Sequence, residues 1–161
     1  MSPHIAWMQR ALEEALAAGA AGEAPIAALV VRQGELLSVG RNTKTSQRCG
    51  FAHAELNALL RAADKLGRHP SDAVLYSTLE PCAMCLGAAV FAGIRTVVYG
   101  AEDSQGGATR MFQDDPIYSR WLPVMIGGVL RDECETLLAS VPPTAQDRHT
   151  QRPRREDIPC G

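Results

Sequence analysis

The chain has 161 residues, enough for one ordinary domain with a substantial core and too few for two full-sized domains. Hydrophobic residues make up 46% and charged residues 21%, a composition typical of globular proteins rather than of disordered or fibrous ones. The formal net charge of −2 gives no general attraction for nucleic acid, so a partner of that kind would need a local basic patch.

The sequence also indicates the cellular compartment in which the protein is expected. No stretch approaches the roughly 18 to 20 continuous apolar residues that a membrane-spanning helix requires, so we expect no membrane partner. The first residues do not form a basic segment followed by an unbroken apolar run, because Glu13 and Glu14 interrupt it. Five cysteines, an odd number, do not suggest a disulfide framework, and a close pair in a reducing compartment indicates metal or redox chemistry. We therefore expect a cytoplasmic protein and look first at Cys82 and Cys85.

The first part of the chain predicts a helix, a β-hairpin and a second helix. The expected spans are 4–18 for the first helix, 25–32 and 35–40 for two strands, and 53–66 for the second helix. Gln33-Gly34 separates the two apolar runs as a hairpin turn does. The loop over 41–52 is polar, and Gly67 with Pro70 beyond it marks the end of the second helix.

The second part alternates strands with helices. The expected spans are a strand at 73–79, a helix with Pro81 as its first residue and 82–92 as its body, a strand at 94–99, an irregular segment at 100–123 with a short helix near 116–121, a strand at 124–127 and a helix at 132–140. The helix after Pro81 is apolar all round, so we expect it to be covered on every side, with another subunit as one candidate cover. The pattern predicts one α/β domain over 1–140, with a partly parallel sheet between helices, and a polar, partly basic tail over 141–161.

The cysteine pair is the first chemical signal. Cys82 and Cys85 are three residues apart near a predicted helix start, so both sulfurs can lie on one face of the helix. A helix N-terminus lowers the pKa of a thiol and so promotes the thiolate that a metal needs. By itself, C-x-x-C fits a redox pair or half of a structural zinc site equally well.

A second motif narrows this choice. His53-Ala54-Glu55 starts the preceding helix, and alternating strands and helices can bring two such helix N-termini to one edge of the sheet. One nitrogen and two sulfurs then converge, and a catalytic zinc takes three protein ligands and leaves its fourth position to water. Cys49 is the only nearby further cysteine and is more simply a loop thiol than a fourth ligand. We predict one zinc ion per chain, bound by His53, Cys82 and Cys85.

Glu55 stands where a proton carrier is needed. Bound zinc lowers the pKa of water from 15.7 to about 7, which provides a nucleophile at neutral pH. Glu55 could accept the proton of this water and pass it to a ring nitrogen and then to a departing amine. A lone glutamate in the first turn of a helix could equally be a solvated carboxylate stabilised by the helix dipole. However, His53-Ala54-Glu55 followed by Pro81-Cys82-Ala83-Met84-Cys85 matches the known H-x-E…P-C-x-x-C signature of zinc deaminases.

Over roughly residues 4–140 the chain resembles the cytidine and deoxycytidylate deaminase superfamily. TLEPCAMC followed by GAAVFAGIRTVVYGAED is similar to the branch that contains bacterial tRNA adenosine deaminases, guanine deaminases and the fungal type of cytosine deaminase. The resemblance implies a three-layer α/β/α fold with a mixed five-stranded sheet, one zinc ion and a homodimer.

The resemblance also suggests substrate contacts. Asn42 matches an asparagine that hydrogen-bonds a ring or carbonyl group of the base, although a turn residue would also fit there. The segment 112–118 is similar to a guanine deaminase loop in which aromatic and acidic residues approach the purine, although its aspartates could instead cap a helix before Pro116. The aromatic candidates Phe51, Phe112 and Trp121 could stack on the flat ring of a heterocycle or pack in the core. Glu102 and Asp103 lie just beyond a strand end, where ligands collect in open α/β sheets. The candidate substrate-binding residues are Asn42, Phe51, Ala54, Asp103, Phe112, Asp114, Asp115 and Trp121.

These observations favour a zinc-dependent hydrolase that removes an exocyclic amine from a nucleobase-like heterocycle, such as guanine or cytosine, and releases ammonia. The alternative is a tRNA adenosine deaminase that forms inosine, because GVLRDECETLL resembles the tRNA enzymes. Their usual basic extension is replaced here by SVPPTAQDRHTQ, although the arginines between 148 and 155 could still contact phosphates. A non-catalytic zinc-stabilised interaction module has less support, because Glu55 and an open coordination position would serve no purpose in it.

Overall fold

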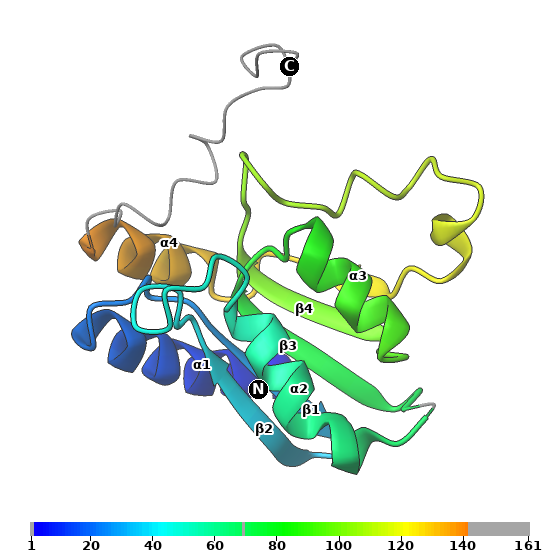
Figure 1. Ribbon diagram of the computed structural model, residues 1–161, viewed down its shortest axis with the longest axis horizontal. Coiled ribbons are helices and arrows are strands. Elements are labelled where there is room, and N and C mark those ends of the chain that lie inside the picture. Colours follow the sequence, from blue (N-terminus) through cyan, green and yellow to red (C-terminus); the bar gives the residue numbers. More distant parts are fainter. Residues whose placement is uncertain (1, 69, 142–161) are drawn as a thin grey trace.

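The computed structural model describes residues 2–68 and 70–141, which form a mixed sheet covered by helices (Figure 1). The sheet has five strands in the order β2-β1-β3-β4-β5. In chain order the elements are α1 (Pro3–Ala20), β1 (Ala27–Arg32), β2 (Glu35–Arg41), α2 (Ala54–Leu66), β3 (Ala73–Leu79), α3 (Ala83–Phe91), β4 (Thr96–Ala101), the short 3-10 helix η1 (Tyr118–Arg120), β5 (Val124–Ile126) and α4 (Arg131–Ser140). The predicted order of helices and strands is therefore confirmed.

The sheet combines a hairpin with a parallel half. β1 pairs antiparallel with both β2 and β3, whereas β3, β4 and β5 run parallel to one another. The turn between β1 and β2 has Gln33 at φ 52° and Gly34 at φ 78°, the pair of positive angles that a tight two-residue hairpin needs. The crossover through α3 makes β3 and β4 parallel, so their carboxyl ends meet at one edge of the sheet. That edge is where ligands bind in open α/β sheets.

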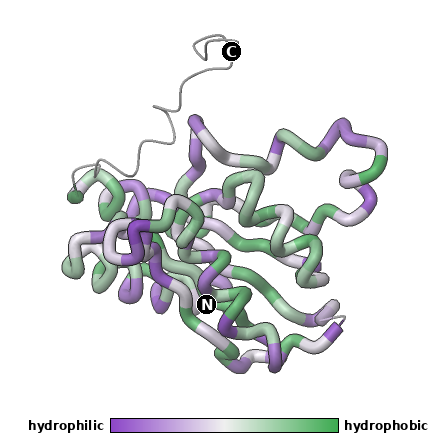
Figure 2. The backbone as a smooth tube through the Cα atoms, viewed as in Figure 1, coloured by the Kyte–Doolittle hydropathy of each residue, from purple (hydrophilic) through white to green (hydrophobic). Residues whose placement is uncertain are grey.

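Helices cover both faces of the sheet, which confirms the predicted three-layer α/β/α fold. α2 and α3 lie on one face, where Ala58 and Ala89 belong to the same buried cluster as Val30 and Leu75. α1 and α4 lie on the other, where Met8 and Cys134 pack with strand residues in a second buried cluster. Figure 2 shows that the strands between these helices are mainly hydrophobic, whereas hydrophobic and hydrophilic residues alternate along the long connection after β4. None of the helices within the described ranges is long and apolar enough to cross a bilayer.

The start of α2 lies unusually close to β2. A side chain at Gly40 would place its Cβ 2.0 Å from the carbonyl oxygen of Ala54 and 2.4 Å from the amide nitrogen of Ala58. The hydroxyl of Ser38 donates to the carbonyl of Ala58 at 2.7 Å. Only glycine allows this approach, and it fixes the first turn of α2, which carries Glu55 and follows His53.

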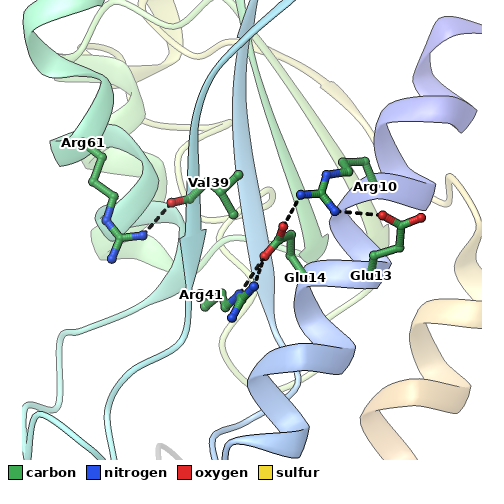
Figure 3. A network of polar contacts seen from close by, with 6 residues as sticks. All are labelled: Arg10, Glu13, Glu14, Val39, Arg41 and Arg61. Atoms are coloured by element: carbon green, nitrogen blue, oxygen red, sulfur yellow. Dashed lines mark hydrogen bonds and ion pairs between the residues drawn. The ribbon is translucent and has the colours of Figure 1, made fainter.

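A polar network fastens α1 to the end of β2 (Figure 3). Glu14 is only 6% exposed, and its carboxylate accepts hydrogen bonds from Arg10 on the same helix and from Nε of Arg41, the latter at 2.7 Å. Arg61 on α2 donates to the carbonyl of Val39 at 2.7 Å. β2 is thus held from both faces of the sheet just before the chain enters the loop that begins at Asn42.

Most element boundaries differ from the predicted spans by one or two residues, and two of these shifts have a clear local cause. α3 begins at Ala83 with Cys82 as its N-cap at φ −72° and ψ 172°, so Pro81 precedes the helix rather than opening it. β4 begins at Thr96 rather than Ile94, because the amide of Ile94 donates to the carbonyl of Ala89 and completes the C-terminal cap of α3. The backbone of Ile94 is therefore used by the helix and not by the sheet.

Within the single chain α3 is not covered on every side, so its predicted full cover needs a second subunit and stays a prediction. Met84 is 38% exposed and Phe91 is 81% exposed, while Cys85, Leu86 and Ala89 are buried. Helical spacing puts Met84 and Phe91 on one face of α3, because they are seven residues apart. No other element of the described chain covers this face.

The C-terminal segment beyond Val141 lies outside the described residues. The predicted tail over 141–161 and its arginines fall almost entirely in that segment, as the thin trace in Figure 1 indicates. The division into a domain over 1–140 and a tail therefore stays a prediction.

Candidate active site

The three predicted metal ligands converge. His53 is the N-cap of α2, Cys82 is the N-cap of α3, and Cys85 lies in the first turn of α3. The imidazole Nδ1 of His53 lies 3.6 Å from Sγ of Cys82 and 3.6 Å from Sγ of Cys85. A nitrogen and a sulfur bound to one tetrahedral zinc ion at roughly 2.0 and 2.3 Å lie about 3.5 Å apart, close to the observed separations. The spacing of this cluster therefore fits a zinc ion.

Protonation of the cluster leads to the same conclusion. The hydrogen bond with Cys85 lowers the pKa of Cys82 to about 3, against the opposing effect of burial. The same hydrogen bond raises the pKa of Cys85, and burial acts in the same direction. Burial would lower the pKa of His53, but the contact with Cys82 outweighs it and raises the pKa. A divalent cation bound here would displace protons from these groups, because zinc binds cysteine as the thiolate.

Glu55 lies beside the cluster and is 4% exposed. Its carboxylate accepts a hydrogen bond from the hydroxyl of Ser77 at 3.0 Å and one from the thiol of Cys85 at 3.5 Å. Burial raises the pKa of Glu55, since water is absent to stabilise the charged form. A cation in the cluster would counteract this rise. A carboxyl beside such a cluster is placed to act as a proton carrier.

The cluster opens into a cavity of about 680 Å³ at the edge of the sheet where β3 ends. His53, Glu55 and Cys82 line it, whereas Cys85 is buried behind them. The volume is within the range of roughly 300 to 1,000 Å³ that small-molecule sites occupy. The other lining residues are Ala24, Pro25, Ile26, Asn42, Lys44, Gly50, Phe51, Leu79, Glu80, Ala83, Met84, Asp103, Gln105, Gly106, Leu138 and Val141.

One wall of the cavity comes from the loop between β2 and α2. Asn42 is 4% exposed, and its side-chain oxygen accepts a hydrogen bond from the amide of Lys44 at 3.1 Å. Phe51 is 63% exposed and lies at the rim. Glu23 anchors this loop, because its carboxylate accepts hydrogen bonds from the backbone amides of Thr45 at 2.9 Å and Ser46 at 2.7 Å.

A second wall comes from the loop after β4. Asp103, Gln105 and Gly106 line the cavity from this side. The Oδ1 atom of Asp103 accepts from the amides of Gln105 at 2.9 Å and Gly106 at 3.0 Å. This carboxylate therefore also shapes its own turn. Three of the predicted substrate-binding residues, Asn42, Phe51 and Asp103, line the cavity.

The structure does not bring the other five candidates to the cavity. Ala54 is fully buried in the core beneath the site, because its backbone packs against Gly40. The distal part of the loop after β4 extends past α3 (Figure 1). In this part the ring of Tyr118 lies near those of Phe112 and Trp121, with centroid distances of 5.6 and 6.3 Å. Asp115 accepts from the amides of Ile117 and Tyr118 and so caps a turn. The candidates that lie away from the cavity are Ala54, Phe112, Asp114, Asp115 and Trp121.

Some lining residues had no signal in the sequence. Leu138 and Val141 reach the cavity from α4 and the residue after it, more than fifty residues beyond the cysteine pair. Lys44 is 3% exposed despite its charge and its place in a polar loop. Glu80 could have been found, because it follows a predicted strand at the edge where ligands collect and directly precedes the Pro81-Cys82 motif.

Comparisons with known proteins agree with this site. The sequence model of the MafB19-like deaminase family matches residues 2–121. The tRNA-specific adenosine deaminase of Bacillus subtilis (strain 168) is 34% identical over 139 residues, which cover 83% of this chain and 85% of that protein. The guanine deaminase of the same strain is 36% identical over 119 residues, covering 71% and 74%.

Solved structures agree as well. The guanine deaminase from Nitrosomonas europaea superposes with a TM-score of 0.69 at 30% identity, over 83% of this chain and 81% of that one. The family match covers most of the chain, including His53, Cys82 and Cys85, the group that could hold a metal ion. The chain belongs to the MafB19-like deaminase family and is a hydrolytic deaminase of nucleobases or nucleosides.

Proposed function

We propose that this deaminase acts on a free aminated heterocycle such as guanine or cytosine, and that it uses one zinc ion held by His53, Cys82 and Cys85. One observation carries the proposal: three ligand atoms lie within 4.8 Å of one another beside a buried carboxylate, and two of these ligands and the carboxylate residue line one cavity of small-molecule size. The ligand atoms are Nδ1 of His53 and the two sulfurs. One nitrogen and two thiolates form a donor set that zinc favours in catalytic sites.

When bound, zinc polarises a water molecule and lowers its pKa toward neutrality. The side chains perform the proton transfers. Glu55 takes a proton from the attacking water and delivers it to a ring nitrogen of the substrate as the carbon–oxygen bond forms. It then moves the second proton of that water to the exocyclic amine as the carbon–nitrogen bond breaks. The products are an oxo heterocycle and ammonia, so one water molecule is consumed per turnover.

Ser77 orients Glu55 for this task. Its hydroxyl donates to one carboxylate oxygen at 3.0 Å and leaves the other oxygen on the side of Cys85. Ser77 is fully buried on β3, so the contact is shielded from water. A carboxylate fixed in this way loses little freedom when the substrate enters.

The two walls hold the ring. Phe51 at the rim offers a flat aromatic face for stacking. The side-chain oxygen of Asn42 is turned toward the amide of Lys44, so its amino group is the part that donates to an oxo group or ring nitrogen of the substrate. Asp103 lies on the second wall and accepts from N–H groups of the ring.

Several of the comparisons favour a second substrate. A tRNA-specific adenosine deaminase aligns with 83% of this chain, so a flipped adenosine in tRNA remains the alternative. The net charge of −2 argues against it, because RNA enzymes gain most of their affinity from contacts with phosphates.

The deciding assay compares two reactions of the zinc-loaded protein. The first is ammonia release from guanine, cytosine, adenine and aminotriazines, and the second is conversion of adenosine to inosine in a tRNA anticodon stem-loop. The Glu55→Gln variant provides the background for both. We expect turnover of at least one free base and none of the stem-loop. Conversion of the stem-loop without turnover of any free base would establish the tRNA reaction instead.

The proposal includes a homodimer and a cytoplasmic location. The exposed face of α3, defined by Met84 and Phe91, is apolar and adjoins the cavity, because Met84 also lines it. A second copy that covers this face would bury both side chains. The cytoplasm suits the site because the thiols of Cys82 and Cys85 hold a metal only where they stay reduced.

A further inference from the structure

Glu80 is a buried carboxylate that the proposed reaction does not use. It follows β3, directly precedes Pro81 and is 4% exposed. Its Oε2 atom accepts from the amide of Asp103 at 3.1 Å, and its Oε1 atom accepts from the amide of Thr109 at 3.1 Å. One carboxylate therefore joins the two ends of a seven-residue loop, 103–109.

The loop is also shaped around this carboxylate. A Cβ added to Gly107 would lie 2.3 Å from Oε2 of Glu80 and 2.6 Å from the carbonyl oxygen of Asp103. Real side chains cannot approach so closely, so a residue without a side chain is required at this position. The amide of Gly107 donates to the carbonyl of Asp103 at 3.0 Å and closes the turn.

The same segment is tied to the metal-binding motif. The amide of Ala108 donates to the carbonyl of Pro81 at 3.0 Å, and Gly107 pairs with Cys82 as an isolated antiparallel bridge. The amide of Glu80 itself donates to the carbonyl of Ala101 at 2.8 Å. The metal-binding motif and loop 103–109 thus form one unit with the carboxylate at its centre.

We propose that Glu80 is a positioning residue, which fixes the substrate-binding wall formed by Asp103, Gln105 and Gly106 relative to the metal cluster. These three residues line the same cavity as Asn42 and Phe51. Without the carboxylate, the loop must be ordered by the substrate at a cost in conformational entropy. This cost weakens binding, whereas the proton transfers by Glu55 are unaffected once the substrate is in place. The inference rests on the proposed reaction taking place in this cavity.

The test compares Glu80→Ala and Glu80→Gln with the wild-type protein, all loaded with zinc. We expect KM to rise about tenfold in Glu80→Ala with kcat within about threefold, which is the signature of lost ground-state binding. Glu80→Gln keeps one acceptor but turns an amino group toward an amide donor, so its KM lies between the other two. Asp72→Asn is the matched control: Asp72 accepts from Arg32 and Gln33 near the start of β3, at the opposite end of the strand from Glu80, so its loss leaves KM unchanged.

A second variant approaches the contact from the loop. Gly107→Ala should raise KM as Glu80→Ala does, because the new methyl group displaces the carboxylate. The double variant should show less than the product of the two single effects, since both remove the same contact. If the rises in KM of the two single variants multiplied fully in the double variant, the inference would be contradicted. A rise in KM accompanied by loss of zinc would contradict it as well.

Hydrogen exchange separates this inference from the proposed function. Exchange at the amides of Asp103 and Thr109 should speed up at least tenfold in Glu80→Ala and stay unchanged in Asp72→Asn. This measurement needs no substrate, so it stands even if the wild-type protein deaminates none of the compounds tested. Unchanged exchange at both amides would overturn the role of Glu80, whatever the kinetics show.

Discussion

Glu55 is the residue whose chemistry depends most on its surroundings. Burial raises its pKa, Ser77 fixes one of its oxygens, and the thiol of Cys85 approaches the other. We expect Glu55→Gln to keep fold and zinc, because the amide has the same shape, and to lower kcat by at least about 100-fold. Steady-state ammonia release and metal analysis of the same sample check both parts. Near-normal turnover with a good substrate would remove Glu55 from the mechanism.

The metal ligands give a second prediction at this scale. Cys82→Ser and Cys85→Ser should each lower zinc from about one ion per chain to well below half, because a hydroxyl is a poor zinc ligand. Cys49→Ser is the matched control, since Cys49 is a free, half-buried thiol in the loop before α2. It should keep full zinc content and activity. If all three variants bound zinc equally, the ligand assignment would be wrong.

Glu23 predicts a pH dependence of stability. Burial would raise its pKa, but hydrogen bonds from Ser46 and Thr45 outweigh it and hold the pKa below the usual 4.5. The charged carboxylate of Glu23 therefore contributes its full stabilisation above pH 4.5. This stabilisation is lost as the pH falls through the pKa of Glu23 in the folded protein, which is the lower of its two pKa values. We expect Glu23→Gln to lower the free energy of unfolding by about 1 to 3 kcal/mol at pH 7 and to differ less from the wild-type protein below pH 4.

Urea unfolding of both proteins at several pH values tests this. Loss of zinc in acid affects the two proteins alike, so their difference reports Glu23. A difference that stays constant from pH 7 to pH 3 would show that the carboxylate contributes nothing by its charge.

Between elements, the closest contact is that of α2 with β2 at Gly40. A methyl group there would overlap backbone atoms of Ala54 and Ala58, which cannot move without shifting the whole first turn of α2. We expect Gly40→Ala to cost about 2 to 3 kcal/mol, a fall in Tm of roughly 5 to 10 °C. Gly50→Ala is the control, since no atom lies within 4 Å of its added Cβ. Thermal unfolding of the two variants should therefore differ clearly, and equal Tm values would contradict the contact.

For the whole molecule, the exposed face of α3 predicts the assembly. Phe91→Glu places a charge in the proposed interface and should convert the dimer to monomer, with zinc content and helical content retained. Leu16→Glu is the matched control, because Leu16 is 61% exposed on α1, in the other helical layer. Sedimentation at micromolar concentration measures both variants. A wild-type protein that sediments as a monomer would refute the dimer.

The sequence by itself determined the elements and the chemistry. Helical and strand periodicity, together with punctuation such as Gln33-Gly34, depend on local backbone and solvation preferences, so the predicted elements were found with small shifts at their ends. At Ile94 the strand begins later than predicted, because the backbone amide of this residue caps the preceding helix α3 and is not available to pair in the sheet. The convergence of His53, Cys82 and Cys85 was also predicted, because two helix N-termini at one sheet edge follow from topology.

Only the tertiary structure decided which side chains surround the substrate cavity. Leu138, Val141 and Lys44 line it, although nothing local in the sequence marks them, because α4 and the loop after β2 are brought there by packing. Phe112 and Trp121 looked suitable by residue type but lie with Tyr118 on a part of the loop that extends past α3. Chemistry can be predicted from residue type and spacing, whereas the walls of a cavity depend on contacts between segments far apart in the chain, and those form only on folding.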